Sequence, residues 1–169
     1  MIEVSPRLWV GGQAAYETVR ERAELEDPRM PGWAIVHAAK EPFHREMLGY
    51  TTRAAPKDDP EYLWGIRGNR LILNLVDAAD PAYIPESLIS QAVAFVELHR
   101  KIGNVLVHCN QGRSRSPTIA MLALAPNLEP DYEDSLAAFG GRYPDYAPAI
   151  GMRDFARSNW SYYHTRGQE

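Results

Sequence analysis

The sequence predicts an α/β fold with a central, mostly parallel twisted sheet flanked by helices. Short apolar runs alternate with amphipathic stretches over most of the chain, and only helical patterns follow after residue 116. Residues 105–107 are a fully apolar run, typical of a strand buried in a parallel sheet. With residues 71–76 and the helical stretch between them, they form a βαβ unit. Strands alternating with helices favour helices packed on both sides of such a sheet.

The N-terminal part is expected to hold two strands around one helix. Residues 8–10 form a short strand that two glycines end. In residues 13–25, apolar side chains recur at four-residue steps, which predicts an amphipathic helix. Turn-forming residues at 27–28 and 31–32 end this helix. Residues 33–38 are apolar and predict a buried strand.

Residues 41–69 are expected to form a long loop with some short helix or strand, because they are polar and hold three prolines. A loop of this length is either functional or a solvated excursion. His37 and His44, near its beginning, are expected at the surface. Positive charges in and beside the loop are expected on a solvated face: Arg53, Lys57, Arg67 and Arg70.

The remaining elements follow from helix signals. Pro85 suits the first position of a helix that runs to residue 101, with Gly103 placed to end it. Further helices are expected over residues 116–124, 132–139 and 150–160.

Length and composition exclude several classes of protein. The chain has 169 residues and a net charge of −4, so a single domain over residues 1–169 is expected, without the basic footprint of a nucleic-acid binder. One cysteine excludes a disulfide framework, and the five histidines lack metal-ligand spacing, so no metal or cofactor is expected. The N-terminus does not resemble a signal peptide, and no apolar run approaches the roughly 18 residues of a membrane span. A cytoplasmic protein without a membrane partner is expected, and the sequence indicates no oligomeric state.

The segment 107–118 carries the clearest chemical signal. It reads Val-His-Cys-Asn-Gln-Gly-Arg-Ser-Arg-Ser-Pro-Thr and lies between an apolar strand and a helix. Ligands of α/β folds bind at the carboxyl ends of strands, and the next helix offers free N–H groups and a positive dipole end. A glycine allows a tight turn, and an arginine fork can hold two oxygens of a phosphate. The predicted phosphate site comprises Asn110, Gln111, Gly112, Arg113, Ser114 and Arg115.

Cys109 opens this loop and is the expected nucleophile. A thiol that faces a helix N-terminus and arginines ionises easily, and the thiolate is a strong nucleophile near neutral pH. The chemistry that fits is in-line attack of sulfur on phosphorus, which gives a phosphocysteine. A buried structural thiol is the ordinary alternative. The combination of Cys109, five residues and Arg115 favours catalysis.

The string 108–118 closely resembles the active-site loop of the dual-specificity protein phosphatases. These belong to the cysteine-dependent protein tyrosine phosphatase superfamily, whose signature is His-Cys, five residues, Arg and Ser or Thr. Residues 5–11 resemble the first strand of that family, and residues 143–155 resemble its C-terminal helical segment. The resemblance implies a protein tyrosine phosphatase-like fold.

The resemblance also implies roles for single residues. Cys109 is the nucleophile, and Arg115 with the loop amides binds the phosphate and stabilises its transition state. Ser116 corresponds to the hydroxyl that stabilises the leaving thiolate when water breaks the phosphoenzyme. His108 supports and shapes the loop, and Ser114 braces it.

Phosphatases of this family use an Asp upstream of the cysteine as general acid, and two candidates follow the strand at residues 71–76. Asp77 leaves the strand directly and can reach over the cleft. Asp80 precedes Pro81 and fits a turn or helix cap better. Asp77 is therefore the expected proton donor.

The expected function is metal-independent hydrolysis of phosphate monoesters on a phosphorylated protein or peptide. Phosphotyrosine is the first expected substrate, and phosphoserine or phosphothreonine are accepted if the cleft is shallow. A phosphoinositide or inositol phosphate phosphatase is the alternative, although such relatives carry more lysine than the neutral Asn110 and Gln111 provide. A phospho-binding module without turnover is a second alternative, which Cys109, Arg115 and Asp77 together argue against.

Overall fold

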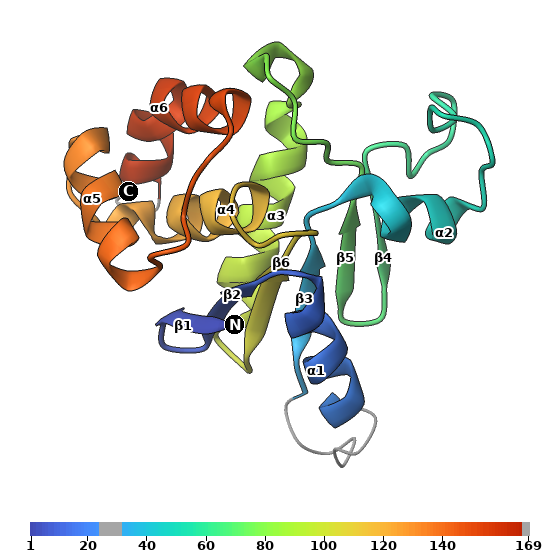
Figure 1. Cartoon of the computed structure of the whole chain (residues 1–169), viewed down its shortest axis with the longest axis horizontal. Coiled ribbons are helices and arrows are strands. Elements are labelled where there is room, and N and C mark those ends of the chain that lie inside the picture. The colour runs from blue at the N-terminus through green and yellow to red at the C-terminus, as the bar shows by residue number, and fades with distance from the viewer. Residues whose placement is uncertain (24–31, 167–169) are drawn as a thin grey trace.

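The computed structural model describes residues 1–23 and 32–166. Across these residues the strands form one sheet in the order β1-β2-β6-β3-β5-β4 (Figure 1). The strands are β1 (Ile2–Ser5), β2 (Leu8–Gly11), β3 (Ala34–His37), β4 (Trp64–Arg67), β5 (Arg70–Leu73) and β6 (Val105–His108).

The four inner strands are parallel, and each outer strand is antiparallel to its neighbour. The predicted α/β fold with a mostly parallel sheet is therefore confirmed. In the register between β3 and β6, Ala34 lies beside Val105 and His37 lies beside His108. The carboxyl ends of the inner strands consequently meet at one edge of the sheet.

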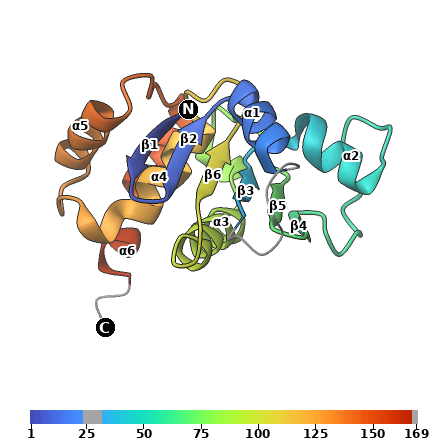
Figure 2. The ribbon, with the colours of Figure 1, turned by 90° about the horizontal axis from the view of Figure 1, so that it is seen from below.

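Alternating side chains of the inner strands face two different cores. Val36, Leu71 and Val107 pack in the larger core, under α3 (Glu86–His99), α4 (Arg115–Leu124), α5 (Tyr132–Arg142) and α6 (Ile150–Thr165). Ile35 and Leu106 point the other way, into a smaller core beneath α1 (Gln13–Ala23) and the turn η1 (Lys40–His44). Figure 2 shows α1 on one side of the sheet and α3 on the other.

The predicted helices all form, with small changes at their ends. Pro85 is the N-cap of α3 and not its first residue, and α4 begins one residue early, at Arg115. Asp131 caps α5, because its carboxylate accepts hydrogen bonds from the Glu133 N–H over 2.8 Å and from the Asp134 N–H over 3.1 Å. The predicted end of the first helix lies in residues 24–31, outside the described residues.

Residues 41–69 form the predicted long loop, with short helical and strand segments in it. It contains most of η1, α2 (Arg45–Leu48) and the whole of β4, and a short 3₁₀ turn, η2 (Pro81–Tyr83), follows β5. A second short turn, η3 (Ala125–Asn127), extends α4. β4 forms a hairpin with β5 through Gly68, whose φ of +61° suits a tight turn. Edge strands such as β4 and β1 carry too few buried side chains to show a clear apolar pattern.

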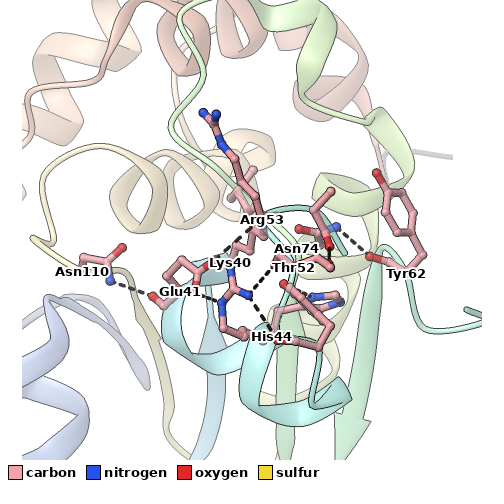
Figure 3. Close-up of polar contacts among 12 residues, drawn as sticks. Lys40, Glu41, His44, Thr52, Arg53, Tyr62, Asn74 and Asn110 are labelled. Atoms are coloured by element: carbon pink, nitrogen blue, oxygen red, sulfur yellow. Dashed lines mark hydrogen bonds and ion pairs between the residues drawn. The ribbon is translucent and has the colours of Figure 1, made fainter. Parts of the chain in front are cut away.

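Polar contacts tie residues 49–63 to the rest of the molecule (Figure 3). The Lys40 ammonium donates to the Arg53 carbonyl over 2.6 Å, and the Asn74 amide donates to the Tyr62 carbonyl over 2.9 Å. No helix of the described ranges is long and apolar enough to cross a membrane.

Candidate active site

The loop of residues 109–114 joins the carboxyl end of β6 to the first turn of α4 (Figure 1). A cavity of about 620 Å³ opens there. It is lined by Asp77, Cys109, Asn110, Gln111, Arg113, Ser114, Arg115, Ala147 and Ala149. The structure therefore gathers most of the predicted site residues around one cavity. Gly112, Ser116 and His108 lie beneath it and are buried.

Cys109 lines the cavity from below and is only 2% exposed. Its Sγ accepts a hydrogen bond from the Gly112 N–H over 3.2 Å. The Ser116 hydroxyl lies 3.2 Å from the same sulfur and 3.1 Å from the Gly11 carbonyl. Its single proton can be directed at either acceptor, so Ser116 is placed to donate to a sulfur anion.

The loop can adopt this shape only with glycine at position 112. Gly112 has a φ of +76°, and a Cβ there would lie 2.6 Å from the Gly12 nitrogen. The Tyr143 hydroxyl donates to the Gly112 carbonyl over 2.8 Å, and the Ala147 N–H donates to the Arg113 carbonyl over 2.8 Å. Burial raises the pKa of Tyr143 to about 12, so its hydroxyl remains a donor at neutral pH. Nothing in the sequence around Tyr143 signals this contact with the loop.

The Arg115 side chain reaches over the loop and is 13% exposed. One terminal nitrogen donates to the Leu75 carbonyl over 3.1 Å, and the other donates to Asn110 Oδ1 over 2.6 Å. Its Nε is buried, has no hydrogen-bond partner among the described residues, and lies 4.0 Å from Asp77 Oδ2. This N–H therefore lies beside the Asp77 carboxylate without a hydrogen bond from it.

Asp77, and not Asp80, lies at the cavity. Ser114 Oγ donates to Asp77 Oδ1 over 2.9 Å and accepts from the Ala149 N–H over 3.0 Å. The Asp77 side chain is 34% exposed. Asp80 instead caps η2, with its carboxylate accepting from the Ala82 N–H over 2.8 Å, as its position before Pro81 predicts.

Three further predicted residues lie at the rim of the cavity. Asn110, Gln111 and Arg113 are exposed. The Asn110 side-chain amide donates to the Glu41 carbonyl over 2.9 Å, which links the loop to η1 (Figure 3). Asn110 thus holds Arg115 with its oxygen and the backbone of η1 with its nitrogen.

The surface positions expected for His37 and His44 are wrong, because both side chains are fully buried. His44 Nε2 lies 3.0 Å from the Glu61 carbonyl oxygen, and its Nδ1 lies 3.3 Å from the Tyr50 hydroxyl. His37 pairs with His108 at the carboxyl ends of β3 and β6, beneath α1 and η1. Arg70 is also half-buried, against His37, whereas Arg53, Lys57 and Arg67 are exposed as expected.

Within the described ranges, no group of three or more His, Cys, Asp or Glu side chains is arranged to hold a metal ion. The cavity lining includes one thiol, from Cys109, one carboxyl group, from Asp77, and the guanidinium groups of Arg113 and Arg115.

Comparisons with known proteins agree on the fold. No family model matches the chain. A MAP kinase phosphatase with leucine-rich repeats from Dictyostelium discoideum is 33% identical over 79 residues, which are 46% of this chain and only 9% of that protein.

Solved structures match over nearly the whole chain. DUSP15 superposes with a TM-score of 0.60 and 19% identity, covering 95% of this chain and 86% of its own. The human tyrosine phosphatase-like serine/threonine/tyrosine-interacting protein superposes with a TM-score of 0.61 and 18% identity, covering 96% of this chain and 97% of its own. Human DUSP28 superposes with a TM-score of 0.56 and 18% identity, covering 99% of this chain and 98% of its own. The chain has the fold of the dual-specificity phosphatases, which confirms the resemblance seen in its sequence.

Proposed function

We propose that this protein is a cysteine-dependent phosphatase, acting as one catalytic domain. It hydrolyses phosphate monoesters of proteins or peptides, phosphotyrosine first, through a phosphocysteine at Cys109. One observation carries the proposal: Cys109, Arg115 and Asp77 line the same cavity. The cytoplasm remains the location predicted from the sequence.

In the first step the phosphate binds between Arg115 and the backbone N–H groups of the loop. The Cys109 thiolate attacks phosphorus in line, the S–P bond forms and the bond to the ester oxygen breaks. Asp77 donates its proton to that oxygen, which leaves as an alcohol or phenol. The donors around the phosphate stabilise the charge that develops in the transition state.

In the second step water attacks the phosphocysteine. The carboxylate of Asp77 accepts a proton from the water, the new P–O bond forms and the S–P bond breaks. Inorganic phosphate is released, and both electrons of the S–P bond remain on the Cys109 sulfur as a thiolate. The hydroxyl of Ser116, 3.2 Å from that sulfur, donates to the thiolate as it is released.

The test of this function combines turnover with capture. Purified protein is expected to hydrolyse p-nitrophenyl phosphate and a phosphotyrosine peptide without added metal, and Cys109→Ser is expected to abolish both activities. Full activity of Cys109→Ser would contradict the covalent mechanism. Binding of phosphopeptides without turnover by the unaltered protein would favour the phospho-binding module instead.

Cys109→Ser also serves to identify the substrate class. Offered phosphotyrosine, phosphoserine and phosphothreonine peptides together with phosphoinositides in vesicles, it is expected to retain phosphotyrosine peptides preferentially. The neutral Asn110 and Gln111 at the rim support this choice over a polyanionic head group. Preferential retention of a phosphoinositide would overturn the choice of a protein substrate.

A further inference from the structure

Two buried histidines form a pair directly behind the nucleophile. His37 ends β3, His108 ends β6, and the two are neighbours in the register of the sheet. His108 Nε2 and His37 Nδ1 lie 2.7 Å apart, which is a short hydrogen bond. His108 is the residue immediately before Cys109, so the pair adjoins the first peptide group of the phosphate loop.

Aromatic rings separate this pair from solvent. The ring of Tyr16, from α1, stacks on that of His108 with a centroid distance of 5.0 Å and an interplanar angle of 7°. The ring of Phe43, from η1, lies 4.3 Å from His37 and 5.0 Å from His108. Both histidines are fully buried. Their protons are consequently controlled by the few polar groups that reach them.

Arg70 is the charged group that contacts the pair directly. It begins β5, and its Nε donates to His37 Nε2 over 3.0 Å. Arg115, on the side of the active site, acts on His108 through its charge. Tyr16 contributes its ring, and the Cys109 backbone adjoins His108. Because an arginine side chain can only donate hydrogen bonds, His37 Nε2 must be an acceptor and carries no proton.

The remaining protons follow from this single constraint. A neutral His37 without a proton on Nε2 carries it on Nδ1 and donates it to His108 Nε2. His108 Nε2 is then an acceptor, and the proton of the neutral ring lies on Nδ1. Two buried imidazoles beside a guanidinium remain neutral because a further positive charge has no solvent to stabilise it.

We propose that Arg70 and His37 are positioning residues for the nucleophile: through two successive hydrogen bonds they fix His108 as the Nδ1–H tautomer, which directs a donor at the Cys109 backbone. This inference rests on the proposed role of Cys109 as nucleophile. It assigns a function to two residues that lie outside the catalytic cavity and outside the signature loop.

The surroundings of His108 support this tautomer. Burial lowers the pKa of His108 to about 3, and the charges of Arg70 and Arg115 also lower it, whereas the backbone of Cys109 raises it. A backbone group that raises the pKa of an imidazole accepts a hydrogen bond from it. The His108 Nδ1 is buried and has no other hydrogen-bond partner among the described residues, and Cys109 is the next residue in the chain.

The tautomer matters because it decides what the first peptide group of the loop meets. With the proton on Nδ1, the contact with the Cys109 backbone is attractive. With the proton on Nε2, a nitrogen lone pair would face the same acceptor and repel it. That peptide begins the turn whose Gly112 N–H donates to the Cys109 sulfur, so its displacement weakens the stabilisation of the thiolate.

The first test is a direct observation of the protons and needs no variant. In ¹⁵N-histidine-labelled protein, NMR is expected to show His37 and His108 as neutral Nδ1–H tautomers that do not titrate between about pH 8 and about pH 5.5. His37→Asn assigns the signals. A proton on Nε2 of His108, or titration of either ring in this range, would overturn the proposal. Neither result depends on whether the protein is a phosphatase.

The second test measures the thiolate itself. His37→Asn keeps an N–H at the position of Nδ1, whereas His37→Leu removes it. The rate of Cys109 alkylation by iodoacetamide is expected to be nearly unchanged by His37→Asn. In His37→Leu the pH profile of the alkylation rate is expected to shift upward by about one pH unit. At low pH this shift corresponds to an approximately tenfold slower reaction. An unshifted profile in a folded His37→Leu protein would contradict the proposal.

Arg70→Met provides the same test if His37→Leu fails to fold. Arg70 is half-buried at the edge of a separate cavity of about 460 Å³, so the shorter side chain leaves no closed void. Its alkylation profile is expected to shift in the same direction. Arg67→Met, at the other side of the same hairpin turn, removes an exposed arginine paired with Glu61 and is expected to shift nothing. Equal profiles for the two variants would overturn the role of Arg70.

Discussion

The loop that carries the nucleophile and the loop that carries the acid are built in opposite ways. The nucleophile loop, residues 109–114, is fixed from beneath by interior groups, including the Tyr143 hydroxyl and a required glycine at 112. The acid loop, residues 75–80, is mostly exposed, and the Asp77 side chain contacts Ser114 of the nucleophile loop and Arg115 at the start of α4. The first loop is thus held from the interior, whereas the acid in the second loop is held only by contacts at the surface of the site.

This difference separates stability from chemistry. A substitution beneath the nucleophile loop is expected to change both the free energy of unfolding and the reaction. A substitution in the acid loop is expected to change the reaction and leave unfolding nearly unaltered.

The largest expected effect comes from Arg115→Lys. Lysine keeps a positive charge but cannot supply both the Nε–H and the bonds to Leu75 and Asn110. We expect kcat/KM for p-nitrophenyl phosphate to fall about a thousandfold. Arg142→Lys, at an exposed position of α5, is the matched control and is expected to retain activity. A fall of less than about tenfold in Arg115→Lys would contradict the assigned role.

Asp77→Asn is expected to lower kcat about a hundredfold for alkyl phosphates, whose leaving groups need a proton. The decline of the rate at higher pH, which reflects loss of the acid proton, is expected to flatten. The melting temperature is expected to change little, because the side chain is partly exposed. Asp80→Asn, three residues along the same loop, is the control. If Asp80→Asn changes the pH profile and Asp77→Asn does not, the assignment of the acid is wrong.

Acid is expected to destabilise the protein through His37 and His108. Burial, with the neighbouring charges, lowers the pKa of His37 to about 2 and that of His108 to about 3. The unfolded chain therefore binds these two protons below about pH 6.5, whereas the native protein does not, and stability falls as the pH is lowered.

Urea unfolding at pH 8 and at pH 5 measures this effect. These two histidines are expected to contribute a loss of about 1 to 2 kcal/mol each between the two conditions. In His37→Asn the loss of free energy of unfolding between pH 8 and pH 5 is expected to be smaller by the contribution of one histidine. An equal pH dependence in the variant would show that His37 is not held neutral.

Gly151→Ala tests how the acid loop is docked. A Cβ at Gly151, in the first turn of α6, would lie 2.0 Å from the Ala78 carbonyl oxygen, so the loop must move. We expect kcat to fall about tenfold through displacement of Asp77. Gly140→Ala, in α5, meets nothing within 4 Å and is expected to keep full activity. Equal activities of the two variants would contradict the docking of the loop on α6.

The smallest effect on the reaction is expected for Tyr143→Phe. This change leaves the buried Gly112 carbonyl without its donor and is expected to lower the free energy of unfolding by about 1 kcal/mol. Activity is expected to fall only a few-fold, since the loop retains its glycine and the contact from Ala147. Tyr162→Phe, an exposed residue of α6, is the control and is expected to change neither property.

The sequence predicted best those parts of the site whose residues are close together in the chain. Cys109 and Arg115 could be placed by their spacing within residues 108–116, whereas the roles of Ser116 and Asp77 came from the resemblance to the phosphatase family. The proline that follows Asp80 signals a helix cap, so the sequence distinguishes Asp80 from Asp77 as the less suitable general acid.

The parts that the sequence did not predict arise from contacts between distant segments. His37 meets His108 only because β3 and β6 are neighbours in the sheet, and Tyr143 reaches Gly112 from the segment after α5. Gly151 touches the acid loop from α6. The position of β4 within residues 41–69 cannot be located from the sequence, because its local pattern is weak and its partner β5 stabilises it.

The central claim is that Cys109 forms a covalent bond to phosphorus during turnover. Ser116→Ala removes the hydroxyl next to the sulfur and is expected to slow hydrolysis of the intermediate, so that it accumulates. Acid quenching of this variant during turnover of p-nitrophenyl phosphate, followed by peptide mapping by mass spectrometry, is expected to find one phosphoryl group on the peptide that contains Cys109. A phosphoryl group on another residue, or none during active turnover, would contradict the account.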